Sequence, residues 1–147
     1  MAGYSKRSLA DKLGMKRGLK MVFLRPPRNY FSLLGPLPEP IQILKKTVRD
    51  MDLIHLFTRS RREYEKKLPQ LRKALSPNGA LWVSWPKLAS KVPTDMSENI
   101  VRDLALKNGL VDIKVCAVDE VWSGLKLVIP LKDRPKFQKP KPGRTKA

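Results

Sequence analysis

The chain has 147 residues, 41% of them apolar, which is enough for one ordinary hydrophobic core and too little for two full domains. Lysine and arginine number 31 against 13 acidic residues, so the net charge is +18, and a polyanionic partner is the first expectation. A single cysteine, Cys116, excludes an intramolecular disulfide and a cysteine-based zinc site. With no apolar run long enough for a signal peptide or a membrane span, we expect a cytoplasmic protein with no membrane contact.

The first half of the chain predicts short helices alternating with strands. Residues 8–13 form a helix capped by Ser8 and ended by Gly14, and residues 20–24 form a first strand that two prolines stop. Asn29 is placed to cap a helix through residue 34, and a proline-rich connector leads to a second strand at residues 41–44. Residues 51–57 are apolar on both faces apart from Asp52 and His55, which is typical of a central strand.

The second half predicts two amphipathic helices and three further strands. Ser60 begins a basic helix that runs to residue 75, and Pro69 predicts a kink or a second short helix there. After an Asn78-Gly79 turn, residues 80–85 form a fourth strand, and Asp95 caps a helix through residue 107. Two strands with alternating apolar residues follow, and we expect them to form a hairpin that ends the fold. The apolar face of the first carries residues 111, 113, 115 and 117, and that of the second carries residues 125, 127, 129 and 131.

This order of elements indicates an α/β protein. Strands that alternate with helices predict a Rossmann-like three-layer sandwich with a mostly parallel sheet of five to six strands and a C-terminal antiparallel hairpin. We expect one domain over residues 1–131 and a flexible basic tail over residues 132–147. The tail holds seven cations and one carboxylate, which leaves a net charge of +6 there and +12 on the folded body.

Two resemblances to known families follow from these residues. The element order, the hairpin and the phrase LSPNGALWV at residues 75–83 resemble class I methyltransferases, with at least one strand and helix missing. The strings MAGYS (1–5), LGPLP (34–38), WVSWPK (82–87), KVPTD (91–95) and VCAVDEVWSGL (115–125) resemble the bacterial domain of unknown function 3052 family. That second resemblance implies relatives of the same fold and no assigned activity.

The methyltransferase resemblance implies a cofactor site whose usual residues are missing. Such enzymes place glycines after the first strand and an acidic residue after the second to hold S-adenosylmethionine. Here Arg25-Pro26-Pro27 follows the first strand and Lys45-Lys46 follows the second. We therefore expect no cofactor and keep a degenerate S-adenosylmethionine-dependent methyltransferase as one alternative only.

Basic and hydroxyl side chains follow three of the predicted strands. In a parallel sheet these positions meet at one rim, where arginines and free helix-terminal amides hold anionic oxygens. The alternative is that basic residues simply occupy the loops of a very basic protein. The rim residues of this hypothesis are Arg25, Arg28, Arg59, Ser60, Trp85, Lys87 and Lys91.

Two more places hold side chains that could act in catalysis or binding. Glu120 and Trp122, with Asp119 and Ser123, cluster in the hairpin turn and suggest a pocket, although turn chemistry explains the cluster as well. His55 is more simply a buried, satisfied imidazole, and Cys116 a plain strand residue, because neither has a catalytic partner nearby in sequence. No catalytic residue and no metal site are predicted.

A polyanion-binding surface is the leading hypothesis. Its residues are the cations of the basic helix and the proline-spaced tail, namely Arg61, Arg62, Lys66, Lys67, Lys136, Lys139, Lys141 and Arg144. No base-reading motif accompanies them, so binding to nucleic acid would be led by charge and weakly specific. The alternative is a small-molecule protein or cryptic enzyme that binds a phosphorylated or carboxylated ligand at the rim, and the sequence favours a protein that is not an enzyme.

Overall fold

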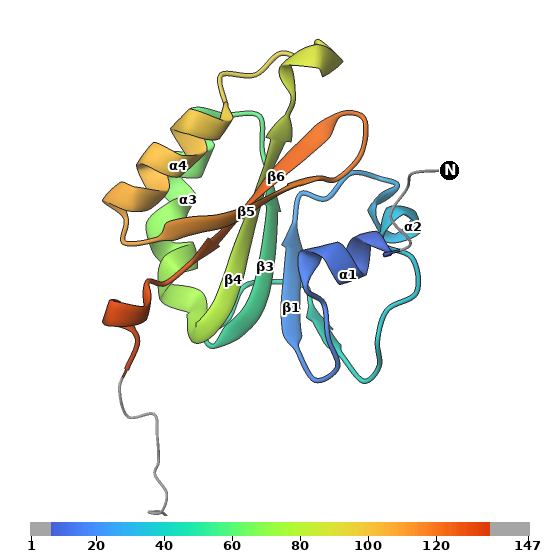
Figure 1. Cartoon of the computed structure of the whole chain (residues 1–147), viewed down its shortest axis with the longest axis vertical. Helices are drawn as coiled ribbons and strands as arrows, with labels where there is room; N and C mark the ends of the chain where they lie inside the picture. The colour runs from blue at the N-terminus through green and yellow to red at the C-terminus, as the bar shows by residue number, and fades with distance from the viewer. Residues whose placement is uncertain (1–6, 136–147) are drawn as a thin grey trace, which may run out of the picture.

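The computed structural model describes residues 7–135, which form a single six-stranded sheet with helices on both faces (Figure 1). Four α-helices and two short 3₁₀ helices accompany the strands. In chain order the elements are α1 (Leu9–Leu13), β1 (Lys20–Leu24), α2 (Tyr30–Leu34), β2 (Gln42–Leu44), β3 (Met51–Phe57), α3 (Arg61–Ala74), β4 (Leu75–Pro86), η1 (Leu88–Ser90), α4 (Glu98–Lys107), β5 (Val111–Ala117), β6 (Trp122–Val128) and η2 (Leu131–Asp133).

The strand order is β2-β1-β3-β4-β6-β5. The first four strands are parallel, whereas β6 runs antiparallel to both β4 and β5. The predicted α/β class, the mostly parallel sheet and the antiparallel terminal hairpin are all confirmed. Because the chain leaves β1 for β2 on one side and then crosses to β3 on the other, the topological switch point lies between β1 and β3.

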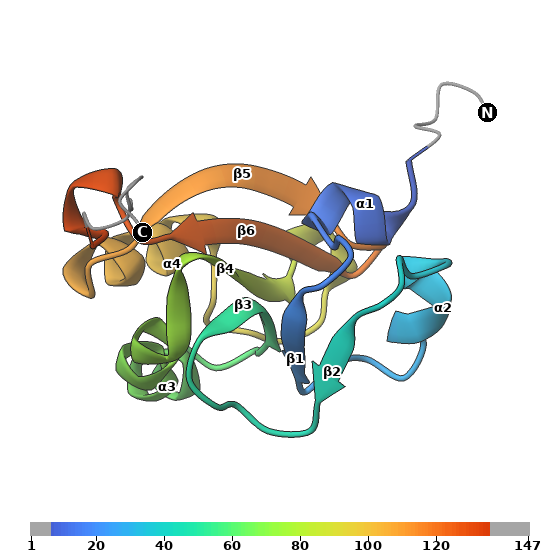
Figure 2. The same cartoon turned by 90° about the horizontal axis from the view of Figure 1, so that it is seen from below.

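Two separate cores fill the two faces of the sheet. Figure 2 shows α1 on one face and α3 on the other. On one face α3 and α4 pack their apolar stripes, including Tyr64, Leu68 and Val101, against β3, β4 and β6. On the other face α1 and α2 cover an aromatic core that includes Tyr30 and Trp82. The Trp82 indole donates to the Leu13 carbonyl over 2.9 Å, which fixes α1 on the sheet.

Helix α3 runs through Pro69, so of the two outcomes predicted there the second short helix is not formed. It begins where Ser60 accepts a hydrogen bond from the Glu63 amide and continues as one helix through Ala74, so no second helix starts at Pro69. Pro69 points to solvent, while Leu68 and Leu71 on either side of it are buried in the core. Tertiary packing of the apolar stripe holds the helix together although the proline removes one backbone donor.

Several boundaries and caps differ from those predicted. Ser8 and Gly14 bound α1 as expected, but Asn29 makes no side-chain cap bond to α2. Helix α4 is capped by Ser97, whose hydroxyl accepts from the Ile100 amide, and not by Asp95. Ser97 takes the capping role because the Asp95 carboxylate accepts a hydrogen bond at the start of α3.

Strands β4 and β5 also correct the prediction. Strand β4 already begins at Leu75, so Asn78 and Gly79 lie within the strand and not in a turn before it. The register against β3 shifts at this point, between Met51 and Leu53. The apolar face predicted for β5 does not lie in the core, since Ile113 is 56% and Val115 is 51% exposed. The reason is that β5 is an edge strand, and α4 extends over only part of it.

Candidate functional site

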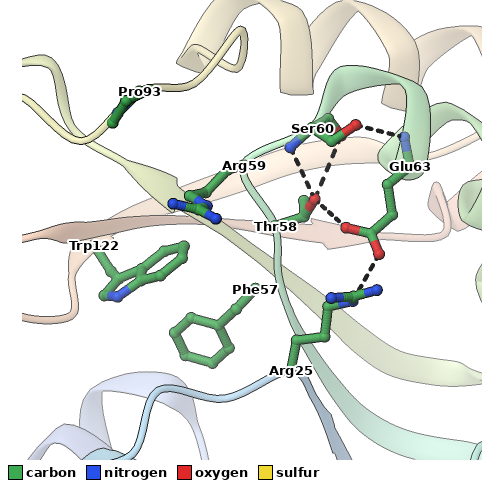
Figure 3. A pocket seen from close by; sticks show the side chains of 8 residues that line it. All are labelled: Arg25, Phe57, Thr58, Arg59, Ser60, Glu63, Pro93 and Trp122. Carbon is green, nitrogen blue, oxygen red and sulfur yellow. Dashed lines mark hydrogen bonds and ion pairs between the residues drawn. The ribbon is translucent and has the colours of Figure 1, made fainter.

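A cavity of about 730 Å³ opens at the switch point, at the carboxyl ends of β1 and β3 (Figure 3). Open α/β sheets bind ligands at this position. The residues come from the turns after β1 and β3, the start of α3, the loop after η1 and the start of β6. They are Arg25, Phe57, Thr58, Arg59, Ser60, Glu63, Pro93 and Trp122, and we call this the switch-point cavity.

One wall of the switch-point cavity is a fixed polar network around Glu63. The Arg25 guanidinium lies 2.7 Å from one carboxylate oxygen of Glu63, and the Thr58 hydroxyl donates to the other over 2.5 Å. The Ser60 amide donates to Thr58 Oγ1 over 3.1 Å, and Ser60 Oγ accepts from the Glu63 amide. The positive charge of Arg25 is therefore locally balanced.

The opposite wall carries a cation and an aromatic ring. Arg59 is exposed, and within residues 7–135 no carboxylate lies within ion-pair distance of it. Trp122 packs edge-on against Phe57, with ring centroids 5.2 Å apart, and both rings line the cavity. The groups available to a ligand are therefore the Arg59 guanidinium, the Trp122 ring and the hydroxyl hydrogen of Ser60.

The loop between β4 and α4 is tied down beside this cavity. Thr94 donates from its hydroxyl to the Arg59 carbonyl over 2.7 Å, and Asp95 accepts from the Arg61 amide over 2.8 Å. Asp95 thus stabilises the amino end of α3, a neighbouring helix, instead of its own. These two bonds hold Pro93 against the cavity.

The structure brings only part of the predicted rim together. Arg25, Arg59 and Ser60 line the cavity, but the other four residues do not. Trp85 is buried in the core on the α3 side of the sheet, which corrects its placement at the rim. The three that remain, Arg28, Lys87 and Lys91, lie in the neighbouring loops and contribute nothing to the lining.

The predicted hairpin pocket is divided in the same way. Trp122 lines the switch-point cavity, whereas Glu120 is exposed and outside its lining. The Asp119 carboxylate accepts from the amides of Val121 and Trp122, each over 2.8 Å, which is turn chemistry. Asp119 therefore positions Trp122.

Two further hollows lie along α3, and most of their lining residues come from this helix. One of about 430 Å³ is lined by Ser60, Arg62, Glu63, Lys66, Lys67 and Gln70. The other, of about 680 Å³, is lined by Thr47, Val48, Arg49, Gln70, Lys73 and Ala74. Shared lining residues join them to each other and to the switch-point cavity, so all three lie end to end; we call the two hollows the α3 groove.

The α3 groove gathers cations without carboxylate partners. Within the described part of the chain, no ion pair is formed by any of Arg49, Arg62, Lys66, Lys67 and Lys73. Arg61, which the sequence had grouped with them, is 3.9 Å from Glu65 and does not line the groove. The predicted tail residues Lys136, Lys139, Lys141 and Arg144 lie outside the described residues.

His55 is the satisfied, buried imidazole that the sequence favoured. Its Nδ1 is 2.6 Å from the Tyr30 hydroxyl and its Nε2 is 2.8 Å from the Ser84 hydroxyl, so both ring nitrogens are hydrogen-bonded. Burial lowers the pKa of His55 to about 3 and raises the pKa of Tyr30. The imidazole is neutral at physiological pH and has no route to solvent, so it links α2 to the sheet.

Metal and membrane features are absent from the described region. Residues 7–135 contain no group of three or more histidine, cysteine or acidic side chains placed to hold a metal ion. In the same range, no helix has the length and apolar character needed to cross a bilayer.

These features define an α/β domain with the class I methyltransferase fold. No protein-family profile and no curated protein sequence matches the chain. Among solved structures, it is similar to an S-adenosylmethionine-dependent methyltransferase from Aquifex aeolicus (15% identity, 82% of this chain and 88% of that chain, TM-score 0.59). It is also similar to precorrin-6y C5,15-methyltransferase from Geobacter metallireducens (9% identity, 83% of this chain and 86% of that chain, TM-score 0.56). A third similar structure is the Methanococcus jannaschii fibrillarin pre-rRNA processing protein (11% identity, 85% of this chain and 74% of that chain, TM-score 0.55). At these identities the likeness shows the fold alone.

Proposed function

We propose that this chain is a binding domain, non-catalytic or derived from an enzyme, that holds a polyanion such as nucleic acid in the α3 groove. One observation carries the proposal: five cations from α3 and the β2-β3 loop line the two neighbouring hollows of the α3 groove, and none of them forms an ion pair with a carboxylate within residues 7–135. In this proposal residues 1–131 form the one domain, and the tail at 132–147 adds further cations.

The dimensions of the groove suit a nucleic-acid strand. Helix α3 has 14 residues, and at about 1.5 Å per residue it is about 21 Å long. A stacked strand carries one phosphate about every 3.4 Å, so about six phosphates span that length. The groove offers lysine and arginine side chains and no base-reading element, which favours contacts to the backbone and weak sequence specificity.

The salt dependence of binding tests the proposal. With labelled single-stranded DNA, one phosphate contact for each of the five groove cations predicts that log K falls with log[salt] with a slope of about −3.5, because each contact releases condensed counterions. Replacing Lys66 and Lys67 by glutamine is expected to weaken binding at least tenfold and to reduce that slope by about 1.4. The measurement is fluorescence anisotropy between about 50 and 200 mM salt.

A matched variant separates groove contacts from general charge. Lys87→Gln with Lys107→Gln removes the same charge outside the groove and is expected to change affinity much less. Equal losses in both double variants would show that only net charge matters, and no binding at low salt would remove the proposal altogether.

Methyl transfer is not the function we propose. The turn after β1 holds Arg25 at a φ of 56° and then Pro26 and Pro27, which have no amide hydrogen to offer a ligand. After β2 come Lys45 and Lys46, with the charge opposite to the carboxylate that holds a ribose. These residues do not fit S-adenosylmethionine in its usual position, and no reaction step is assigned to it.

A second candidate function is the binding of a small anionic ligand in the switch-point cavity. The observation that favours it is the meeting of an unpaired Arg59 with the Trp122 ring in one cavity, which suits a ligand with an acidic group and a flat ring. A thermal-shift panel of nucleotides, carboxylated metabolites and S-adenosylmethionine is expected to show saturable stabilisation by one compound, about 2.7 kcal/mol at a hundredfold excess over Kd.

Two single variants test whether such a ligand binds in the switch-point cavity. Arg59→Gln is expected to abolish the shift, and Arg28→Gln, an exposed arginine outside the lining, is expected to retain it. A panel without any saturable shift, or the same loss in both variants, counts against the cavity.

A further inference from the structure

Two lysines stand directly opposite each other on the β5-β6 hairpin. The antiparallel register pairs Lys114 of β5 with Lys126 of β6. The same face of the hairpin carries Cys116, which belongs to the core under α1 and α2. Both lysines therefore lie on the α1 side of the sheet. Like charges at directly opposed positions of an antiparallel pair destabilise the sheet.

Helix α1 brings two more lysines to the same place. Lys114 donates from its ammonium group to the Lys12 carbonyl over 3.2 Å, and the Lys126 ammonium nitrogen lies 3.7 Å from where a β-carbon on Gly14 would be. Lys12 is in the last turn of α1, and Lys16 follows that helix. We call Lys12, Lys16, Lys114 and Lys126 the lysine cluster.

The electrostatics of the lysine cluster are unfavourable as it stands. Burial, and then the positive charges of Lys114 and Lys16, lower the pKa of Lys126. Burial raises the pKa of Cys116, and the charges of Lys12, Lys114 and Arg7 act against that rise. Within residues 7–135 none of the four lysines forms an ion pair, and the one carboxylate of α1, Asp11, is 3.9 Å from Arg7.

The carboxyl end of α1 relieves this repulsion only in part. Its carbonyl groups attract cations, and the Lys12 carbonyl receives one ammonium group. The helix has five residues, however, so few aligned peptide dipoles act on the cluster. Four lysines, one each from α1, β5 and β6 and one from the loop after α1, are more than this helix end requires.

We propose that the lysine cluster is a binding site for a phosphate-type oxyanion. A dianion with several acceptor oxygens can bind ammonium groups from α1, β5 and β6 at once, and lysine serves as a point charge for phosphate. The site lies on the face of the sheet opposite α3, as Figure 2 shows, so it does not depend on the function proposed for the α3 groove. Inorganic phosphate and the phosphate group of a small metabolite share this chemistry.

The test uses the full-length protein with inorganic phosphate and glycerol phosphate, at constant ionic strength set with chloride. Each phosphate compound that binds is expected to raise the melting temperature saturably and to give a binding isotherm by calorimetry, and a response to only one of them identifies the source. Lys114→Gln with Lys126→Gln is expected to lose both signals. Without phosphate this variant is expected to melt at or above the wild-type temperature, because a repulsive pair has been removed.

Controls separate the site from general screening and from the α3 groove. Lys87→Gln with Lys107→Gln, and Lys66→Gln with Lys67→Gln, are expected to keep the phosphate response. The proposal is overturned by a response that is absent in the wild type, equal in all variants or retained without Lys114 and Lys126. It is also overturned if the Lys114 and Lys126 variant melts well below wild type in phosphate-free buffer, since the lysines would then be structural caps of α1.

Discussion

Lowering the pH from about 7.5 to about 5 is expected to reduce the free energy of unfolding by about 2 kcal/mol, through His55 alone. The chain has one histidine, and it is fully buried between Tyr30 and Ser84. Burial lowers its pKa from 6.5 to about 3 in the folded protein. Most carboxyl groups titrate below this pH range, so the interval isolates the imidazole.

The sign follows from which state binds the proton. Below pH 6.5 the unfolded chain protonates its histidine, while the folded chain keeps the imidazole neutral down to about pH 3. The unfolded state thus binds more protons, and stability falls as the pH falls. The dependence fades above pH 6.5 and is small by about pH 7.5, where the histidine is mostly neutral in both states.

Urea unfolding at a series of pH values measures the effect, and His55→Gln is the control. Glutamine offers both a donor and an acceptor for the hydroxyls of Tyr30 and Ser84 but does not titrate, so the variant is expected to lose the slope between about pH 7.5 and 5. A wild-type protein whose stability stays flat over that interval, or a variant with the same slope, would show that His55 is protonated while folded.

Much of the fold could be predicted because its signals are local. The continuous apolar run of β3 and the Ser60 cap of α3 each depend on residues within one element, and both were predicted correctly. The second short helix suggested at Pro69 and the core position predicted for the apolar face of β5 were wrong, because both depend on tertiary context. Packing of α3 overrode the proline, and an edge position left Ile113 and Val115 exposed.

The candidate sites also contain residues that the sequence could predict and residues that it could not. Arg25, Arg59 and Ser60 could be proposed because each follows a strand of the parallel sheet, and the topology brings such positions together. That Trp122 completes the same cavity depends on where the hairpin docks, which no local pattern specifies. The lysine pair was missed as well, since the register of Lys114 against Lys126 emerges only once the length of the hairpin turn is known.

A substitution at Gly79 is expected to cause a second large loss of stability, at a position where the sequence predicted only a turn. A β-carbon added to Gly79 would lie 2.6 Å from the Met51 carbonyl oxygen and 3.1 Å from the Ser76 hydroxyl. Gly79 is buried, and Met51 begins the neighbouring central strand, so the clash is with backbone that cannot move without shifting β3.

Gly79→Ala is therefore expected to lower the free energy of unfolding by roughly 2–3 kcal/mol, the upper part of the range for overpacking. The adjacent and exposed Asn78→Ala provides the comparison. It loses one exposed hydrogen bond, from the Arg134 guanidinium over 3.4 Å, and is expected to change stability by less than about 0.5 kcal/mol. Both values come from urea unfolding at neutral pH, where His55 contributes little slope. If Gly79→Ala is as stable as Asn78→Ala, then Gly79 does not lie as close to the Met51 carbonyl oxygen as the structure shows.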